Sequence, residues 1–161
     1  MEFGKFLKSF TYAFSGVKHC LKTERNLRFH LVFLTYMFTI LVSTDWFVLS
    51  RSDYAALIVS SALVVTAEVI NTAVENAVNL ASEERSEYGR IAKDAAAGAV
   101  LVAAIFAIIT GFVIMFQVEA FKAMFAYFTD NPLMFLLLLL SLIPAVLIIF
   151  MGNPFSKGKK K

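Results

Sequence analysis

Residues 56–82 read ALIVSSALVVTAEVINTAVENAVNLAS, an apolar segment longer than the roughly 20 residues that a helix needs to cross a bilayer. A spanning segment must be helical, because backbone polar groups find no water inside lipid. Four polar residues recur along it: Glu68, Asn71, Glu75 and Asn79. At about 100° per residue they fall on one narrow face, with Thr72 beside it. This segment therefore predicts a membrane helix with a polar stripe.

The remainder of the chain also has the composition of a membrane protein. Of its 161 residues 59% are hydrophobic, compared with about 45–50% in soluble domains. Residues 3–22 place Phe and Leu at helical spacing with lysines elsewhere, which is typical of an amphipathic helix in the membrane interface. We expect an all-α membrane protein with this N-terminal surface helix, a three-helix transmembrane core and an appended fourth transmembrane helix. The predicted spans are 29–49, 54–80, 95–116 and 132–151.

Charge predicts the orientation of these spans. Basic residues gather before the first span, between the second and third, and after the fourth. The other two connections carry one basic residue each, Arg51 and Lys122. Because cytosolic loops are enriched in Lys and Arg, both termini and the loop 82–94 are expected in the cytosol. The net charge of +3 favours anionic lipid headgroups over nucleic acid as a partner, because the basic residues lie between apolar segments.

The polar stripe is a candidate functional site, because a charge that faces lipid costs from roughly 3 to over 10 kcal/mol. At about 1.5 Å per residue, Glu75 lies roughly 9 Å and Glu68 roughly 20 Å inside the cytosolic end. Depth makes Glu68 a candidate general base or acid. Glu75 is better placed to hold Mg²⁺, which favours a few carboxylates with phosphate oxygens and water. The alternative is a stripe that joins helices by hydrogen bonds, a role that does not require carboxylates.

Two further clusters combine charged groups. In residues 23–30, TERNLRFH, Arg28 lies one turn beyond Glu24 and is expected to pair with it. A basic membrane anchor is the alternative, and His30 by itself predicts only a polar group at a helix end. In residues 90–99, RIAKDAAAGA, Asp94 suits a helix N-terminus and Lys93 suits a phosphate. A capped helix start with a small-residue packing face is equally compatible with that segment.

Together, ERNLRFH (24–30), AEVINTAVENAVNLAS (67–82) and AKDAAAGAVL (92–101) resemble the prokaryotic diacylglycerol kinase family, which also contains undecaprenol kinases. The resemblance covers residues 3–117. It implies a homotrimer in the bacterial plasma membrane that transfers the γ-phosphoryl group of Mg-ATP to a lipid hydroxyl on the cytosolic side. Composition changes near Gln117, so we expect a lipid kinase core at 1–117 and an appended hairpin at 118–161.

The resemblance also implies residue roles. Glu68 would be the catalytic base, Glu24 and Glu75 would bind the metal, and Asn71, Arg28 and Asn79 would support the site or the lipid. The implied nucleotide-binding residues are Lys5, Tyr12, Glu24, Glu75, Glu84, Arg85, Ser86, Lys93 and Asp94. Asn79 departs from the family, which usually has an aspartate there, and an amide cannot supply that negative charge.

The residues of the motifs ERN-x-R-x-H and NTAVE resemble those of the Gram-positive branch of the family. Undecaprenol is therefore the expected substrate, and diacylglycerol is the alternative. A small proton- or cation-coupled transporter is an alternative of another class, since an intramembrane glutamate can carry ions. Transporter sites are expected near the midplane, whereas this stripe runs to the cytosolic end. A structural assembly protein is a third possibility, and it would tolerate loss of the glutamates.

Overall fold

The computed structural model describes residues 2–81 and 86–151, and within these ranges it contains six α-helices and no strand. The prediction of an all-helical chain is confirmed. Four helices, α2, α3, α4 and α6, are long and apolar enough to cross a membrane. The helices are α1 (Glu2–Thr23), α2 (Arg25–Ser43), α3 (Arg51–Ala81), α4 (Glu87–Met115), α5 (Val118–Asp130) and α6 (Pro132–Phe150).

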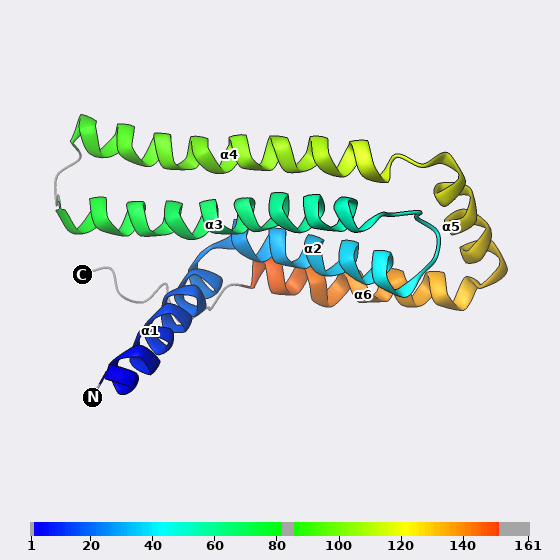
Figure 1. Cartoon of the computed structure of the whole chain (residues 1–161), viewed down its shortest axis with the longest axis horizontal. Helices are drawn as coiled ribbons and strands as arrows, with labels where there is room; N and C mark the ends of the chain where they lie inside the picture. Colours follow the sequence, from blue (N-terminus) through cyan, green and yellow to red (C-terminus); the bar gives the residue numbers. More distant parts are fainter. Residues whose placement is uncertain (1, 82–85, 152–161) are drawn as a thin grey trace.

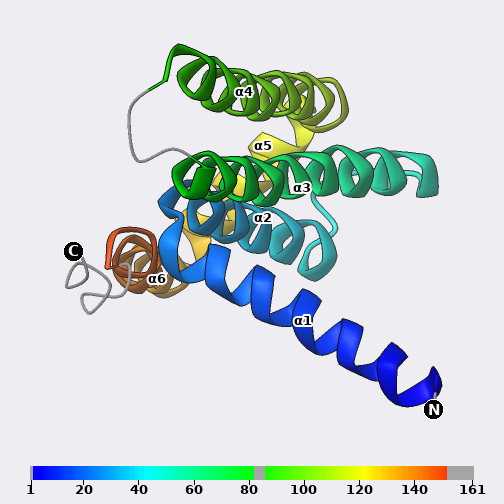
Figure 2. The same cartoon turned by 90° about the vertical axis from the view of Figure 1, so that its left-hand side faces the viewer.

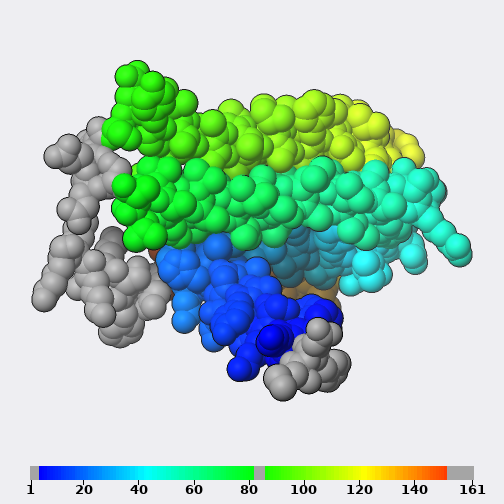
Figure 3. All heavy atoms as spheres, turned by 60° about the vertical axis from the view of Figure 1, so that its left-hand side comes forward, coloured from blue at the N-terminus to red at the C-terminus, as the bar shows by residue number. Residues whose placement is uncertain are grey.

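The long helices pack in a fixed order, with α3 between α4 and α2, and α6 on the other side of α2 (Figures 1 and 2). Helices α3 and α4 pack against each other most extensively, and Figure 3 shows them side by side along the molecule. At one end of the bundle the start of α2 and the end of α6 lie beside the joint with α1, and the end of α3 and the start of α4 extend beyond them on that side (Figure 1). We call this end the α1 end, because α1 joins the bundle there.

Helix α1 projects from the bundle at an angle, because the chain bends at Glu24 (Figure 2). That residue has extended backbone angles, φ −96° and ψ 114°, between two helices. On the two sides of this bend, Cys20 of α1 and Leu27 of α2 are buried. Along α1 the aromatic side chains of Phe6 and Phe14 remain exposed. An exposed apolar face beside lysines agrees with the predicted surface helix.

The predicted first span extends too far, because α2 ends at Ser43 rather than at residue 49. Residues 44–50 leave the helix and turn their aromatic side chains toward α5. The Trp46 ring lies 5.3 Å from the Tyr127 ring, and the Phe47 ring lies 6.0 Å from the Phe121 ring. Aromatic pairs of this kind add stabilisation beyond the area that they bury. Helix α5, within the expected appended hairpin, thus provides the surface against which the residues that follow α2 pack.

The third span begins earlier than predicted, at Glu87 instead of residue 95. Ser86 is the N-cap, and its side-chain oxygen accepts a hydrogen bond from the backbone N–H of Gly89 at 3.0 Å. A capping serine satisfies one of the backbone donors that a helix start leaves without a partner. Asp94 therefore lies about two turns inside α4 and not at its N-terminus, which corrects the expectation for that residue.

Candidate functional site

The deepest part of the candidate site is the carboxyl group of Glu68 on α3. Glu68 is only 2% exposed, and the apolar side chain of Val64 is buried one turn farther from the α1 end. Across the gap, Nε2 of His30 on α2 lies 3.5 Å from Oε1 of Glu68. This distance is within ion-pair range but longer than an ordinary hydrogen bond. The interpretation of His30 as only a helix-end group was incomplete, because the packing of α2 against α3 brings it to the carboxylate.

Nearer the end of α3, the polar stripe changes from buried to exposed. Thr72 is buried, and its hydroxyl donates to the backbone carbonyl of Glu68 at 3.0 Å. Asn71 is buried, and its Nδ2 donates to Oε1 of the partly buried Glu75 at 3.0 Å. Asn79, at the end of the stripe, is exposed. The gradient agrees with the depths that the sequence predicts for Glu68 and Glu75.

One oxygen of this stripe stands out. Oδ1 of Asn71 is buried and has no hydrogen-bond partner within the described ranges 2–81 and 86–151. A buried polar atom without a partner costs free energy, so it normally has a role. The amide of the same side chain holds the carboxylate of Glu75, which places an amide oxygen and a carboxylate side by side. Both are oxygen donors of the type that Mg²⁺ prefers.

Glu24 supplies a third carboxylate from the joint between α1 and α2. It is partly buried and occupies the N-cap position of α2, but its side chain makes no capping hydrogen bond. Helix α1 packs against both α2 and α3, so Glu24, at the joint between α1 and α2, lies on the side of the bundle that also carries the polar stripe of α3. This region is at the α1 end, where the chain passes from α1 to α2 and α3 extends past the joint (Figure 1).

The carboxylates of this region suit a metal ion that takes its remaining ligands from outside the protein. In the part of the chain that the structure describes, no three His, Cys, Asp or Glu side chains gather closely enough to hold a metal by themselves. Mg²⁺ ordinarily takes only one or two protein carboxylates and completes its shell with phosphate oxygens and water. Glu24 and Glu75 therefore fit Mg²⁺ bound to a nucleotide better than a closed structural metal site.

The start of α4 brings basic groups to the same end of the bundle. Nζ of Lys93 donates to Oδ1 of Asn79 on α3 at 2.6 Å. Arg90 and Asp94 form an exposed ion pair at 2.8 Å within α4. Asn79 thus holds Lys93 through a neutral amide oxygen, which leaves the positive charge of Lys93 unneutralised by this partner.

Several predicted residues lie apart from this cluster. Lys5 and Tyr12 are exposed on α1, which points away from the bundle (Figure 1). Glu84 and Arg85 lie outside the described residues. Arg28 does not pair with Glu24 as expected, because its guanidinium donates instead to backbone carbonyls, among them those of Leu21 and Ile149. The predicted ion pair was therefore wrong, since these carbonyls compete successfully for the same donors.

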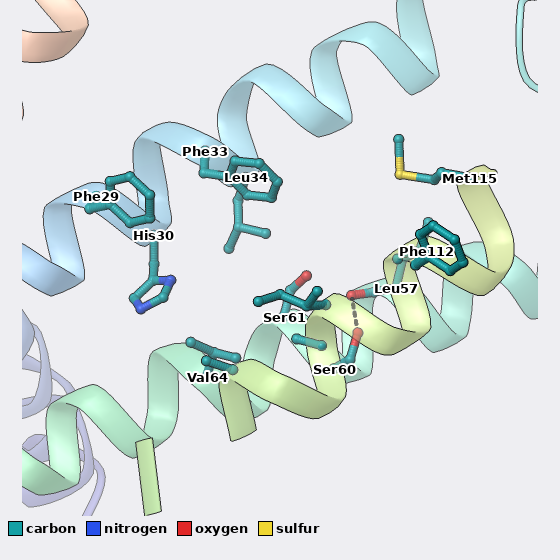
Figure 4. A pocket seen from close by; sticks show the side chains of 14 residues that line it. Phe29, His30, Phe33, Leu34, Leu57, Ser60, Ser61, Val64, Phe112 and Met115 are labelled. Carbon is teal, nitrogen blue, oxygen red and sulfur yellow. Dashed lines mark hydrogen bonds between the residues drawn. The ribbon is translucent and has the colours of Figure 1, made fainter. Parts of the chain in front are cut away.

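An apolar cavity opens beside His30. It has a volume of about 450 Å³ and lies between α2, α3 and α4 (Figure 4). His30 lines it near the α1 end, and Phe112 and Met115 line it near the other end. Its polar lining side chains besides His30 are Ser60 and Ser61, of which Ser60 donates to the carbonyl of Leu57 at 3.1 Å. A mainly apolar cavity thus adjoins the residue that contacts Glu68.

Comparison with known proteins relates this arrangement to a family. Residues 11–115 match the model of the family described as prokaryotic diacylglycerol kinase. A diacylglycerol kinase of Synechocystis sp. is 40% identical over 109 residues, which are 65% of this chain and 59% of that protein. An undecaprenol kinase of Bacillus subtilis (strain 168) is 33% identical over 113 residues, which are 70% of this chain and 89% of that protein.

The match includes every cluster of the candidate site. The carboxylates of Glu24, Glu68 and Glu75 and the amine of Lys93 all lie within residues 11–115, whereas α5 and α6 lie beyond them. The chain spans about three fifths of the length of the Synechocystis relative. The family model, matched over well more than half of the chain, shows that this multi-pass membrane protein belongs to the prokaryotic diacylglycerol kinase family.

Proposed function

We propose that this protein is an ATP-dependent lipid kinase that transfers the γ-phosphoryl group of Mg-ATP to the hydroxyl of a membrane lipid. The observation that carries the proposal is the position of Glu68. Its buried carboxylate lies between an apolar cavity, lined by His30, and a set of oxygen donors that reaches the exposed end of α3. A lipid hydroxyl and a nucleotide phosphate can approach Glu68 from these two directions.

The proposed phosphoryl transfer requires no covalent intermediate with the protein. Phosphoryl transfer depends mainly on positioning and on neutralising charge. Glu68 would accept the proton of the lipid hydroxyl as that oxygen bonds to the γ-phosphorus and the bond from phosphorus to the β-phosphate oxygen breaks, which releases ADP. Glu24 and Glu75 would hold Mg²⁺, which when bound neutralises charge on the phosphate oxygens. Lys93 and Asp94, about two turns inside α4, would contact the nucleotide.

His30 would act as a positioning residue for Glu68. Its ring approaches one carboxylate oxygen at 3.5 Å and also forms part of the cavity wall. A base must be held within hydrogen-bond reach of the proton that it accepts. By holding Oε1 of Glu68, the His30 ring would restrict rotation of the carboxyl group. The second carboxylate oxygen would then stay in position to accept the proton of the lipid hydroxyl.

The cavity would receive part of the lipid's hydrocarbon. Its lining is mostly apolar, and its polar groups are few, as is typical of ligand sites. We propose undecaprenol as the substrate on the wording of ERNLRFH and NTAVE, with diacylglycerol as the alternative. The two relatives support different choices: the diacylglycerol kinase has the higher identity, and the undecaprenol kinase is matched over more of its own length.

Orientation and assembly complete the proposal. The joint that carries Glu24, the second half of α3 and the first turns of α4 lie toward the α1 end (Figure 1), which the positive-inside rule assigns to the cytosol, where ATP is available. The active site and both termini would therefore face the cytosol of a bacterial plasma membrane. By resemblance the protein would act as a homotrimer, and the outer face of α4, whose residues are all described and none of them buried, leaves room for a neighbouring subunit.

The decisive experiment is a phosphorylation assay with the whole chain in nanodiscs. The protein is incubated with γ-labelled ATP, Mg²⁺ and either undecaprenol or diacylglycerol, and the labelled lipid is identified by chromatography. We expect label in undecaprenol and none when Glu68 is replaced by Gln. Label in diacylglycerol alone selects the alternative substrate. No transfer to any lipid, combined with Glu68-dependent proton uptake into proteoliposomes, would establish the transporter instead.

A further inference from the structure

The appended helix α6 ends beside the joint between α1 and α2, and Arg28 connects the three helices. Its Nε donates to the backbone carbonyl of Ile149 on α6 at 3.1 Å. One of its terminal nitrogens donates to the carbonyls of Leu21 and Lys22 on α1, at 3.0 and 3.2 Å. Arg28 itself belongs to the first turn of α2. One guanidinium therefore contacts two helices while it is carried by a third.

The chemistry of these acceptors explains why an arginine occupies the position. The last four carbonyls of a helix have no partner within that helix, and they carry the negative end of its dipole. Leu21 and Lys22 lie in the last turn of α1, and Ile149 lies in the last turn of α6. A planar guanidinium can donate in several fixed directions at once, whereas a lysine amine acts as a point charge. Arg28 thus caps the C-terminal ends of α1 and α6 together.

The position of α6 is independently fixed against α2. In the middle of the pair, the hydroxyl of Tyr36 contacts both the backbone carbonyl and the hydroxyl of Ser141, each at 2.8 Å. At the α1 end, the guanidinium of Arg25 lies over the ring of Phe150, 5.7 Å from its centre. The carbonyl of Ile149 is therefore a fixed reference point for Arg28, and not the end of a loosely attached helix.

The joint that Arg28 closes is the one that carries Glu24. The backbone N–H of Glu24 donates to the carbonyl of Cys20 at 2.8 Å, and the N–H of Arg28 donates to the carbonyl of Glu24 at 3.4 Å. The side chain of Arg28 also donates to the carbonyls of Leu21 and Lys22 on α1, so hydrogen bonds join the two helices on both sides of the bend. Any change in the angle between α1 and α2 must move Glu24, because that residue is the bend.

We propose that Arg28 is a positioning residue through which the appended helix α6 sets the angle of the α1–α2 joint and thereby the placement of Glu24. The inference rests on the proposed function, in which Glu24 and Glu75 hold Mg²⁺ with the nucleotide. It gives the hairpin at 118–161 a role in the kinase core: α6 supplies the carbonyl of Ile149 against which the joint is set. Arg28 acts through Glu24 and does not itself contact the reacting atoms.

The test uses the whole chain in nanodiscs and replaces Arg28 by Lys, which keeps the charge but cannot cap both helices. The control is Arg25→Lys, since Arg25 is in the same turn of α2 and its guanidinium lies over the face of Phe150 on α6. Mn²⁺ binding in the presence of a non-hydrolysable ATP analogue is measured by electron paramagnetic resonance. We expect R28K to weaken Mn²⁺ binding roughly tenfold, the size expected for losing a charge-assisted hydrogen bond. R25K should leave it unchanged, because a lysine still places a cation over the ring of Phe150 and keeps α6 in position.

A second measurement follows the joint directly and needs no activity. Spin labels on Ser9→Cys in α1 and Ser43→Cys in α2, with Cys20 replaced by Ala, report the distance between the two helices. R28K should broaden this distance distribution, and kcat at saturating Mg²⁺ should change far less than the metal affinity. Tyr36→Phe, which loosens α6 without touching the joint, should change both readouts in the same direction by a smaller amount, and it serves if R28K fails to insert.

The outcomes separate this proposal from the proposed function. An unchanged distance distribution, or a broadened one with unchanged Mn²⁺ affinity, overturns the positioning role and leaves the kinase assignment intact. If the unsubstituted protein binds no Mn²⁺ with the nucleotide, both are overturned. Weaker Mn²⁺ binding together with a broadened joint in R28K, and neither change in R25K, establishes the coupling.

Discussion

Helices α3 and α4 lie side by side along most of the molecule, yet they differ sharply in what they bury. Helix α3 buries apolar and polar side chains, and none of the described residues 87–115 of α4 is buried. The buried residues of α3 are Leu57, Ser61, Val64, Glu68, Asn71 and Thr72. The reason is position: α3 has neighbours on two sides, α2 and α4, whereas α4 packs mainly against α3.

This difference in burial indicates which helix can hold catalytic carboxylates within the membrane. A carboxylate is tolerated at membrane depth only where it faces protein, water or substrate, and only the central helix offers such a face along its length. The contribution of α4 comes from its first turns, where Lys93 reaches Asn79. Substitutions of acids should therefore have large effects in the buried part of α3 and small ones at the exposed Glu87 of α4.

Replacing Glu68 by Gln should produce the largest effect. The change keeps the volume but removes the group proposed to accept the lipid proton, so kcat should fall by roughly 10²–10⁴-fold while the protein stays folded and inserted. The matched control is Glu87→Gln on α4, an exposed acid in the first turn of that helix, which should leave kcat nearly unchanged. Near-normal phosphorylation by E68Q, measured with labelled ATP, would remove Glu68 from the role of base.

Replacing Glu24 or Glu75 by Gln should raise the Mg²⁺ concentration needed for half-maximal activity. Both carboxylates are proposed to hold one ion, so the double variant should lose less than the sum of the two single losses in free energy. A titration of initial rate against Mg²⁺ for the four proteins measures this. Additive losses with an unchanged Mg²⁺ requirement would show that the two carboxylates do not share an ion.

Filling the cavity from the side of α4 should affect the lipid and not the nucleotide. Gly111 lines the cavity, and an added Cβ would meet no atom within 4 Å there. Gly111→Leu should therefore insert into the cavity and raise the KM for lipid by about tenfold, with the KM for ATP unchanged; a few displaced methylenes at about 0.8 kcal/mol each account for that size. Val113→Phe, on the outward face of α4 at 74% exposure, is the control. An equal rise of the KM for lipid in both variants would show that the cavity does not bind the lipid substrate.

Ending the chain after Gln117 should have the smallest effect on turnover. All the proposed catalytic groups precede that residue, so the shortened protein should still phosphorylate lipid at saturating Mg²⁺, within a few-fold per folded molecule. It should, however, need more Mg²⁺ than the whole chain, because Arg28 loses the carbonyl of Ile149. A well-folded but inactive truncation that still binds ATP would show that the hairpin shapes the lipid site and that the core at 1–117 is too small.

The sequence was sufficient for the features that depend on a single helix. Span length and helical periodicity predict four membrane helices, the surface helix and the polar stripe of α3, because hydrophobic length and the spacing of residues act within one segment. The order of depth along the stripe, from Glu68 through Glu75 to Asn79, follows from the rise per residue, and the observed burial has the same order. Motif wording within the matched region also predicted the family that the comparison shows.

Features that depend on contacts between segments needed the tertiary structure. His30 is six residues from Glu24 along the chain, but only the packing of α2 on α3 brings it to Glu68. The end of α2 at Ser43 is set by aromatic contacts with α5, and Arg28 finds its acceptor at Ile149, far along the sequence. Side-chain identity shows which groups need a partner. Which partner each group meets depends on how the helices pack, and that is decided by the whole chain.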